Sequence, residues 1–211
     1  MTGFSATSIL DPAWLAERLR LARALYGPAP ERVLGTVWWY STSSVLVAPP
    51  LEALVHTGRA VDPALDAVTL EIHPDGRLVD AHSSRPFDGD AQELGRAMGA
   101  ALQEAVAAVS SACGAGERAL WAIATDSIAN RALWAGQAAR NTGRALAVVD
   151  AVADGIGPVL PRPRFERYGE RLLVRRVSCC LIDKATGQPK CASCPNQHPD
   201  ERVRRIRSAL G

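Results

Sequence analysis

Four of the five cysteines lie within a span of 16 residues near the C-terminal end of this 211-residue chain. Cys179 and Cys180 are adjacent, ten residues follow, and Cys191 and Cys194 then form a C-x-x-C pair. A C-x-x-C turn brings two thiolates to one face, which is a recurrent way to bind zinc or an iron–sulfur cluster. The clustering therefore predicts a metal centre in this segment.

The cellular compartment expected from the sequence supports a metal centre over disulfides. Residues Met1 to Leu10 contain neither the basic region nor the apolar region of a secretory signal. The longest apolar stretch, Val33 to Val55, is interrupted by serines, prolines and a glutamate, and does not predict a membrane span. We expect a cytoplasmic protein that is not transmembrane, and a peripheral position at the inner face of the membrane is compatible with these features. Thiols in a reducing compartment favour metal or redox chemistry.

The adjacent cysteines constrain the kind of metal centre. Neighbouring side chains of an extended strand point to opposite faces, so Cys179 and Cys180 can reach one cofactor only where the backbone kinks. A two-iron core offers four terminal positions on two irons and tolerates this approach better than a single tetrahedral ion. The geometry favours an iron–sulfur cluster, and a structural zinc site is the alternative because four-thiolate sets bind either metal.

Charge divides the chain into two parts. Residues 1–161 contain 12 basic and 17 acidic side chains, whereas residues 162–211 contain 12 basic and 5 acidic ones. The total net charge is only +2, which excludes a polybasic nucleic-acid-binding protein. Three prolines between residues 158 and 163 precede the change of sign. We therefore predict two domains, residues 1–160 and residues 161–211.

Hydrophobic periodicity predicts a mainly α-helical α+β fold. Helical patterns with caps or stop signals cover residues 12–25, 31–57 in two pieces joined at Pro49-Pro50, 91–113, 117–139, 143–153 and 199–210. Residues 68–72 and 77–80 predict a β-hairpin around a turn. The expected architecture is a helical N-terminal domain with a small hairpin, followed by a compact four-cysteine iron–sulfur segment.

The spacing C-C-x10-C-x2-C, preceded by Arg175-Arg176-Val-Ser178 and followed by Leu181, resembles the ferric-siderophore reductase (FhuF) family. The resemblance is strong over roughly residues 171–195. It is weaker upstream, where the helices around Trp38-Trp39-Tyr40 and residues 120–134 are similar to the helical part of that family. The resemblance implies a [2Fe-2S] cluster held by Cys179, Cys180, Cys191 and Cys194, with no catalytic residue beyond these ligands.

The implied activity is one-electron reduction of Fe(III) bound to an imported siderophore, which releases Fe(II) in the cytoplasm. Hard oxygen donors hold the ferric ion far better than the ferrous ion, so a single electron weakens the complex. Cations near the cluster stabilise its more negative reduced form. Arg175 and Arg176 are the candidate substrate-binding residues, because a basic rim would attract an anionic ferric chelate. No flavin or nicotinamide motif is visible, so an external donor is implied, either a ferredoxin or an NAD(P)H-dependent reductase.

Two other functions use the same cysteines. One is a zinc-stabilised module that binds nucleic acid or protein, and the other is a 2Fe-2S electron carrier or iron sensor without siderophore turnover. The reductase interpretation involves no nucleic acid. The fifth cysteine, Cys113, lies at a helix end outside the motif and is predicted to be a buried small hydrophobe.

Overall fold

The computed structural model describes residues 1–211 and confirms the mainly helical α+β class. Its helices are α1 (Pro12–Tyr26), α2 (Glu31–Leu46), α3 (Ala48–Thr57), α4 (Ala91–Cys113), α5 (Glu117–Ala138), α6 (Thr142–Ile156), α7 (Ile182–Thr186) and α8 (Pro199–Leu210). Its strands are β1 (Thr2–Ser5), β2 (Ala60–Val61), β3 (Val68–Ile72), β4 (Leu78–Ser83), β5 (Pro86–Phe87), β6 (Phe165–Tyr168) and β7 (Arg171–Val174), and a 3-10 turn covers Ala6–Leu10.

The predicted helix ends are confirmed where the sequence carries capping chemistry. The Asp11 carboxylate accepts a hydrogen bond from the Ala13 amide at the start of α1. Pro12, the first residue of this helix, has no N–H group that would need an acceptor. Asp90 and Glu93 form a reciprocal capping box at the start of α4. Gly114, with φ of 71°, ends the same helix in the left-handed conformation.

The break in the predicted 31–57 helix differs in position from the prediction. It lies at Val47, which separates α2 from α3, and Pro49 and Pro50 fall inside the first turn of α3. Proline is tolerated there because the first amides of a helix have no intrahelical acceptor to bond. The two prolines therefore lie in the first turn of α3, and the boundary between the two helices is at Val47.

The predicted hairpin is confirmed as β3 and β4, but it belongs to a larger sheet. β1 pairs antiparallel with β3, so the strand order is β1-β3-β4. Two further antiparallel pairs, β2 with β5 and β6 with β7, were also not predicted. These strands have only two to four residues each, too few for an alternating pattern to stand out in the sequence.

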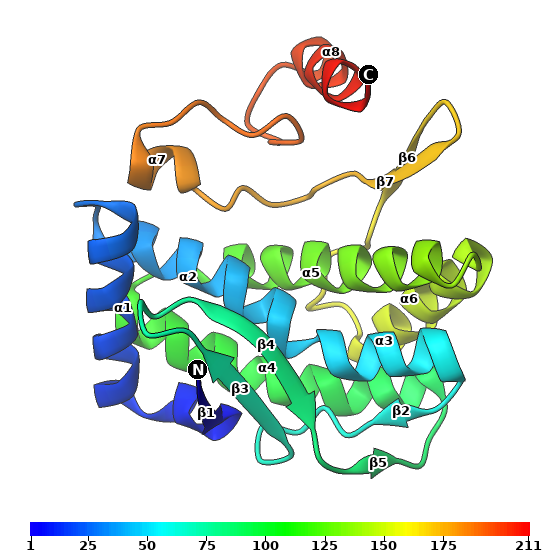
Figure 1. The fold of residues 1–211 in the computed structure, drawn as a ribbon, viewed down its shortest axis with the longest axis horizontal. Helices are drawn as coiled ribbons and strands as arrows, with labels where there is room; N and C mark the ends of the chain where they lie inside the picture. Colours follow the sequence, from blue (N-terminus) through cyan, green and yellow to red (C-terminus); the bar gives the residue numbers. More distant parts are fainter.

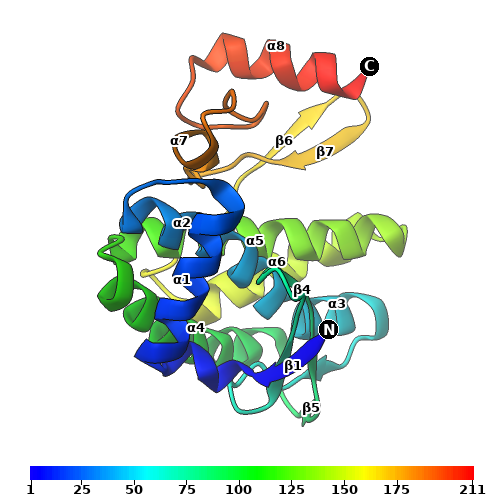
Figure 2. The same cartoon turned by 60° about the vertical axis from the view of Figure 1, so that its left-hand side comes forward.

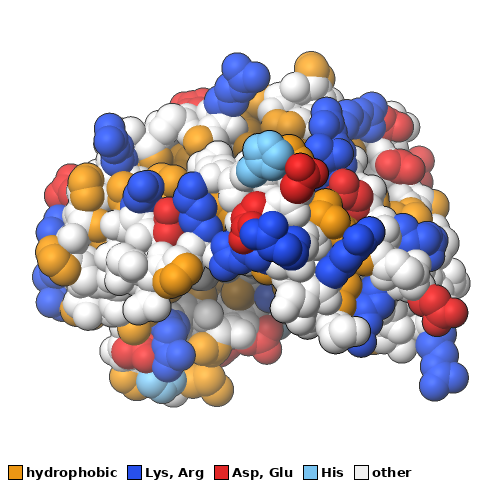
Figure 3. All heavy atoms as spheres, turned by 90° about the horizontal axis from the view of Figure 1, so that it is seen from above, with side chains coloured by type: hydrophobic (Ala, Val, Ile, Leu, Met, Phe, Trp, Pro, Cys, Tyr) orange, Lys and Arg blue, Asp and Glu red, His pale blue; other side chains and the backbone are white.

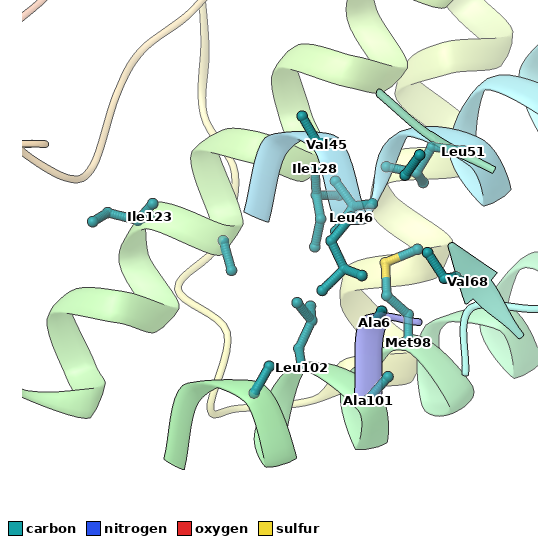
Figure 4. Packing of buried hydrophobic residues seen from close by; sticks show 14 of the residues in the cluster. Ala6, Val45, Leu46, Leu51, Val68, Met98, Ala101, Leu102, Ile123 and Ile128 are labelled. Atoms are coloured by element: carbon teal, nitrogen blue, oxygen red, sulfur yellow. The ribbon is translucent and has the colours of Figure 1, made fainter. Parts of the chain in front are cut away.

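The largest hydrophobic cluster contains 40 buried residues, all between Ala6 and Leu160. In Figure 4, Met98 and Leu102 of α4 meet Leu46 of α2 and Ile128 of α5 in its interior. α4 and α6 cross closely because Gly95 and Gly155 lie at the contact, where an added Cβ on either would overlap the other helix's backbone. This cluster forms the rigid body under the cysteine segment.

Residues beyond 160 lie together on one side of that body. Figures 1 and 2 show β6, β7, α7 and α8 above α2 and α5, on the side away from the three-stranded sheet. The chain crosses the helices from β7 to α7 and then returns toward α8. No helix combines the length and apolar composition needed to cross a membrane.

Candidate metal centre

The four motif cysteines lie in the irregular chain on either side of α7. The sulfurs of Cys179 and Cys194 are 3.6 Å apart. The other two flank an arginine, with Arg176 Nη1 at 3.5 Å from Cys191 Sγ and 4.0 Å from Cys180 Sγ. No three potential ligands converge closely enough to form a single-ion site as they stand. The sulfurs of Cys179 and Cys194 thus form a close pair, and those of Cys180 and Cys191 both contact the Arg176 guanidinium.

Two local backbone features bring the cysteines together. Leu181 has φ of 59°, a left-handed conformation that is rare for a branched residue, directly after Cys180. The chain therefore changes direction immediately after the vicinal pair. At the other pair, the Cys194 amide donates to the Cys191 carbonyl at 3.1 Å and closes the C-x-x-C turn.

Arg176 is buried against the helical body. Only 7% of its side chain is exposed, and its guanidinium carbon lies 4.8 Å from the ring centroid of Tyr40 on α2. Its Nε lies 3.3 Å from Oδ2 of Asp126, and its Nη2 is buried without any partner. A buried cation therefore stands beside two of the thiols and retains an unused hydrogen-bond donor.

Asp126, on α5, holds the chain segment that leads into the cysteines. Its two carboxylate oxygens accept hydrogen bonds from the amides of Val177 and Ser178, at 2.9 and 3.1 Å, and from Ser178 Oγ at 2.6 Å. Together with Arg176, these donors converge on a side chain that is only 1% exposed. The arrangement favours the carboxylate form, which accepts hydrogen bonds on both oxygens.

Burial and neighbouring groups shift the pKa values of three side chains at the centre. Burial raises the pKa of the Asp126 carboxyl, although the hydrogen bonds from Ser178 and Val177 act in the opposite direction. Burial disfavours the charge on Arg176, but Tyr40, Cys180 and Asp126 hold the pKa of its guanidinium above the ordinary value. Burial also raises the pKa of the Cys179 thiol to about 11, so a metal must displace a firmly held proton there.

A stripe along α5 receives residues 172–178. Its members recur at helical spacing: Asp126 binds residues 176–178, Leu133 packs with Val174, and Gln137 Nε2 donates to the Leu172 carbonyl at 3.1 Å. Later residues of α5 contact earlier residues of the segment, so the segment runs antiparallel to α5. The segment is therefore anchored along three turns of helix before it reaches Cys179.

The far side of the centre is held by residues outside the motif. Gln197 Nε2 donates to the carbonyls of Cys191 and Ala192, at 3.1 and 2.7 Å. Arg205, on α8, donates to the Gln197 side chain and to the Lys190 carbonyl. One arginine of the basic tail thus braces the C-x-x-C turn.

The structure distinguishes two arginines that the sequence treated as equivalent. Arg176 is buried at the thiols, whereas Arg175 is 43% exposed and lies 3.6 Å from Glu166 on β6. Cys113, at the end of α4, is buried as predicted, and its thiol donates to the Val109 carbonyl. The basic side chains seen from above are spread over the surface among acidic ones (Figure 3).

The sequence did not identify Asp126, nor did it identify Tyr40 as a partner of Arg176. Asp126 is the only charged residue in a stretch of small or apolar residues, 123–129, and a lone acid in such a stretch is a signal for a buried partner. Trp38 and Trp39, which precede Tyr40, are core residues as expected. Nothing in the sequence pattern indicates that Tyr40 contacts an arginine instead of packing in the core. Their partner Arg176 is 50 residues from Asp126 and more than a hundred from Tyr40 in the chain, so only the fold joins them.

The residues present fit an iron–sulfur cluster. Four thiols supply the ligand set, and the Arg176 guanidinium, whose Nη1 contacts two of them, is a cationic donor that suits a group with sulfur acceptors of its own. Other buried side-chain nitrogens of the chain also have no partner, so the fit rests on the four thiols together with the guanidinium that contacts two of them.

Residues 176–195 match the family described as FhuF 2Fe-2S C-terminal domain. The match contains all four motif cysteines and begins at Arg176, and it identifies the cofactor as a [2Fe-2S] cluster. No curated protein shows a significant match to the chain. The protein therefore carries an iron–sulfur domain similar to that of ferric-siderophore reductases, which indicates redox activity.

Proposed function

We propose that this protein is a ferric-siderophore reductase in which Cys179, Cys180, Cys191 and Cys194 hold the [2Fe-2S] cluster. When bound, the cluster supplies one electron per cycle. The net reaction takes one electron from an external donor and converts chelated Fe(III) to Fe(II), which oxygen ligands hold more weakly. The observation that carries the proposal is the FhuF-type domain match over a segment in which a buried cation contacts two of the thiols.

The chain's own residues prepare this site. Arg176 places a positive charge where the reduced state adds negative charge, and Tyr40 and Asp126 hold that charge in position. The hydrogen bonds of Asp126 and Gln197 fix the backbone on both sides of the thiols. Preorganised donors of this kind need no rearrangement when the charge changes. The electron donor we propose is a ferredoxin or an NAD(P)H-dependent reductase, and we propose a cytoplasmic location.

The test is anaerobic purification of the full chain, followed by iron and sulfide analysis, absorption spectroscopy and electron paramagnetic resonance. We expect a red-brown protein whose dithionite-reduced form gives an S = 1/2 signal and is reoxidised by ferric siderophores with release of Fe(II). Cys194→Ala should abolish the spectrum. Cys113→Ala removes a thiol outside the motif and should leave the spectrum intact.

The alternatives give different results. A colourless protein that contains zinc but no sulfide would contradict the proposal and favour the zinc-stabilised module. A reducible cluster that no ferric chelate reoxidises would favour an electron carrier or iron sensor.

A further inference from the structure

Two adjacent hollows flank Trp134 on the surface of α5. One, of about 240 Å³, lies between α5, β7, α8 and the C-x-x-C turn, and the other, of about 310 Å³, lies between α2, α5 and β4. Tyr40, Asn130 and Trp134 line both hollows. We call the two together the Trp134 groove. Its dimensions are those of a site for a small molecule.

The groove reaches the thiols through two of its lining side chains. Arg176 lines it, and its Nη1 is 3.5 Å from Cys191 Sγ. Ser193 lines it as well, with its Oγ at 3.9 Å from the same sulfur. A molecule in the groove would therefore be separated from a cluster ligand by a single side chain, a separation suited to direct electron transfer.

The walls of the groove are close to neutral. No carboxylate lines it, and its two cations already have acidic partners. Arg131 Nη1 lies 3.3 Å from Glu52 Oε1, and Arg176 Nε lies 3.3 Å from Asp126 Oδ2. The remaining polar groups are neutral amides and hydroxyls, such as Asn130, which can bond to the oxygen-rich surface of a chelate. A polyanion would find little uncompensated positive charge here.

Trp134 provides the apolar contact. It is 52% exposed, whereas every other tryptophan is buried or partly buried. The Arg131 guanidinium lies 5.6 Å from its ring centroid and helps to hold the ring in place. A large exposed aromatic beside a polar hollow is typical of a ligand anchor, because it offers contact area with little loss of conformational entropy.

We propose that the Trp134 groove is the binding site for the ferric substrate, with Trp134 as its anchor, and that it prefers uncharged oxygen-ligated chelates to polyanionic ones. This inference rests on the proposed function for its substrate class. The proposed site lies between α5 and the C-x-x-C turn. Arg175, which the sequence suggested as a substrate-binding residue, does not line this groove.

The experiment uses Ga(III) chelates, which copy the shape of Fe(III) chelates but do not accept an electron. The full cluster-loaded chain is titrated with the uncharged Ga(III) complex of a cyclic tris-hydroxamate, and binding is followed by calorimetry and tryptophan fluorescence. We expect saturable binding that Trp134→Ala weakens at least ~10-fold and that Trp134→Phe largely retains. Val159→Ala, which truncates another exposed apolar side chain outside the groove, should bind like the unmodified protein. The cluster spectrum should be the same in all variants.

A triply negative Ga(III) tris-catecholate provides the charge comparison, and we expect it to bind at least ~10-fold more weakly than the uncharged complex. Unchanged binding in Trp134→Ala, or tighter binding of the trianion, would overturn the proposal. So would a Trp134→Ala variant that binds the chelate normally but accepts electrons slowly from its donor, because the groove would then bind the donor. Binding of Ga(III) chelate without reduction of the Fe(III) form would support the site and reject the reductase function.

Discussion

At the residue scale, burial decides which charges act on the centre. Arg175 and Arg176 are neighbours in the chain, yet one is paired with Glu166 in solvent and the other is enclosed by Tyr40, Asp126 and the thiols. Solvent and salt screen an exposed charge, whereas a buried one keeps most of its effect. The two arginines therefore offer a matched pair of substitutions.

We predict that Arg176→Gln lowers the reduction potential of the cluster by roughly 60 mV, equivalent to about 1.4 kcal/mol for one electron. The sign follows because a cation stabilises the more negative reduced state, and its removal disfavours reduction. Arg175→Gln should shift the potential by less than about 15 mV, since its charge is screened. Potentiometric titration followed by electron paramagnetic resonance measures both. Equal shifts in the two variants would show that burial of Arg176 has no special effect.

We predict that Asp126→Asn destabilises the protein by about 3 kcal/mol, because it leaves the buried Arg176 charge without its counterion and turns an acceptor into a donor. Asp154→Asn is the control: it breaks the ion pair with Arg162, where both side chains are at least half exposed, and should change stability by less than about 1 kcal/mol. Urea unfolding of both variants measures the difference. Similar midpoints would contradict the importance of Asp126 as an anchor.

At the element scale, the helical body depends on close packing that supports the α5 stripe. α4 and α6 approach each other through Gly95 and Gly155, and α5 packs against both helices. Cores resist added volume because backbone atoms cannot move aside as side chains do. A single methyl group added at this crossing would therefore meet backbone atoms that cannot move aside.

We predict that Gly155→Ala destabilises the protein by about 3 kcal/mol, because its Cβ would overlap the Gln92 carbonyl oxygen. Gly143→Ala in the same helix meets nothing within 4 Å and should be neutral or stabilising by up to about 1 kcal/mol, as alanine favours helix. Thermal unfolding of the two variants provides the comparison. A Gly155→Ala variant as stable as Gly143→Ala would show that the helices separate without penalty.

At the scale of the whole molecule, the cysteine segment depends on few apolar contacts. None of residues 161–211 is among the 40 buried residues of the main cluster, although Phe165 packs against it. The segment also contacts the body through Leu172, Val174, Leu181, Ile182 and Ala185, in two small clusters. The polar bonds of Asp126 and Gln197 add to these contacts. We propose on this basis that residues 1–160 fold as one unit and that metal binding supplies much of the stability of residues 161–211.

We predict that removal of the cluster with an iron chelator speeds tryptic cleavage within residues 202–207 by ~10-fold or more, because the segment then opens locally. Residues 1–160 should stay resistant, since their core is independent of the metal. Mass spectrometry of a digestion time course distinguishes the two regions. Simultaneous loss of protection in both would mean that the chain unfolds as a single unit.

Local chemistry along the sequence was sufficient to predict the main helices, their caps and the four-cysteine motif. Capping residues, proline and cysteine spacing act over a few neighbouring positions, so they can be recognised in a single chain. The charge environment of the centre depends instead on pairs such as Asp126 with Arg176 and Tyr40 with Arg176. These pairs are 50 or more residues apart, and whether each charge is buried or solvated is decided only when α2, α5 and the C-terminal segment pack together.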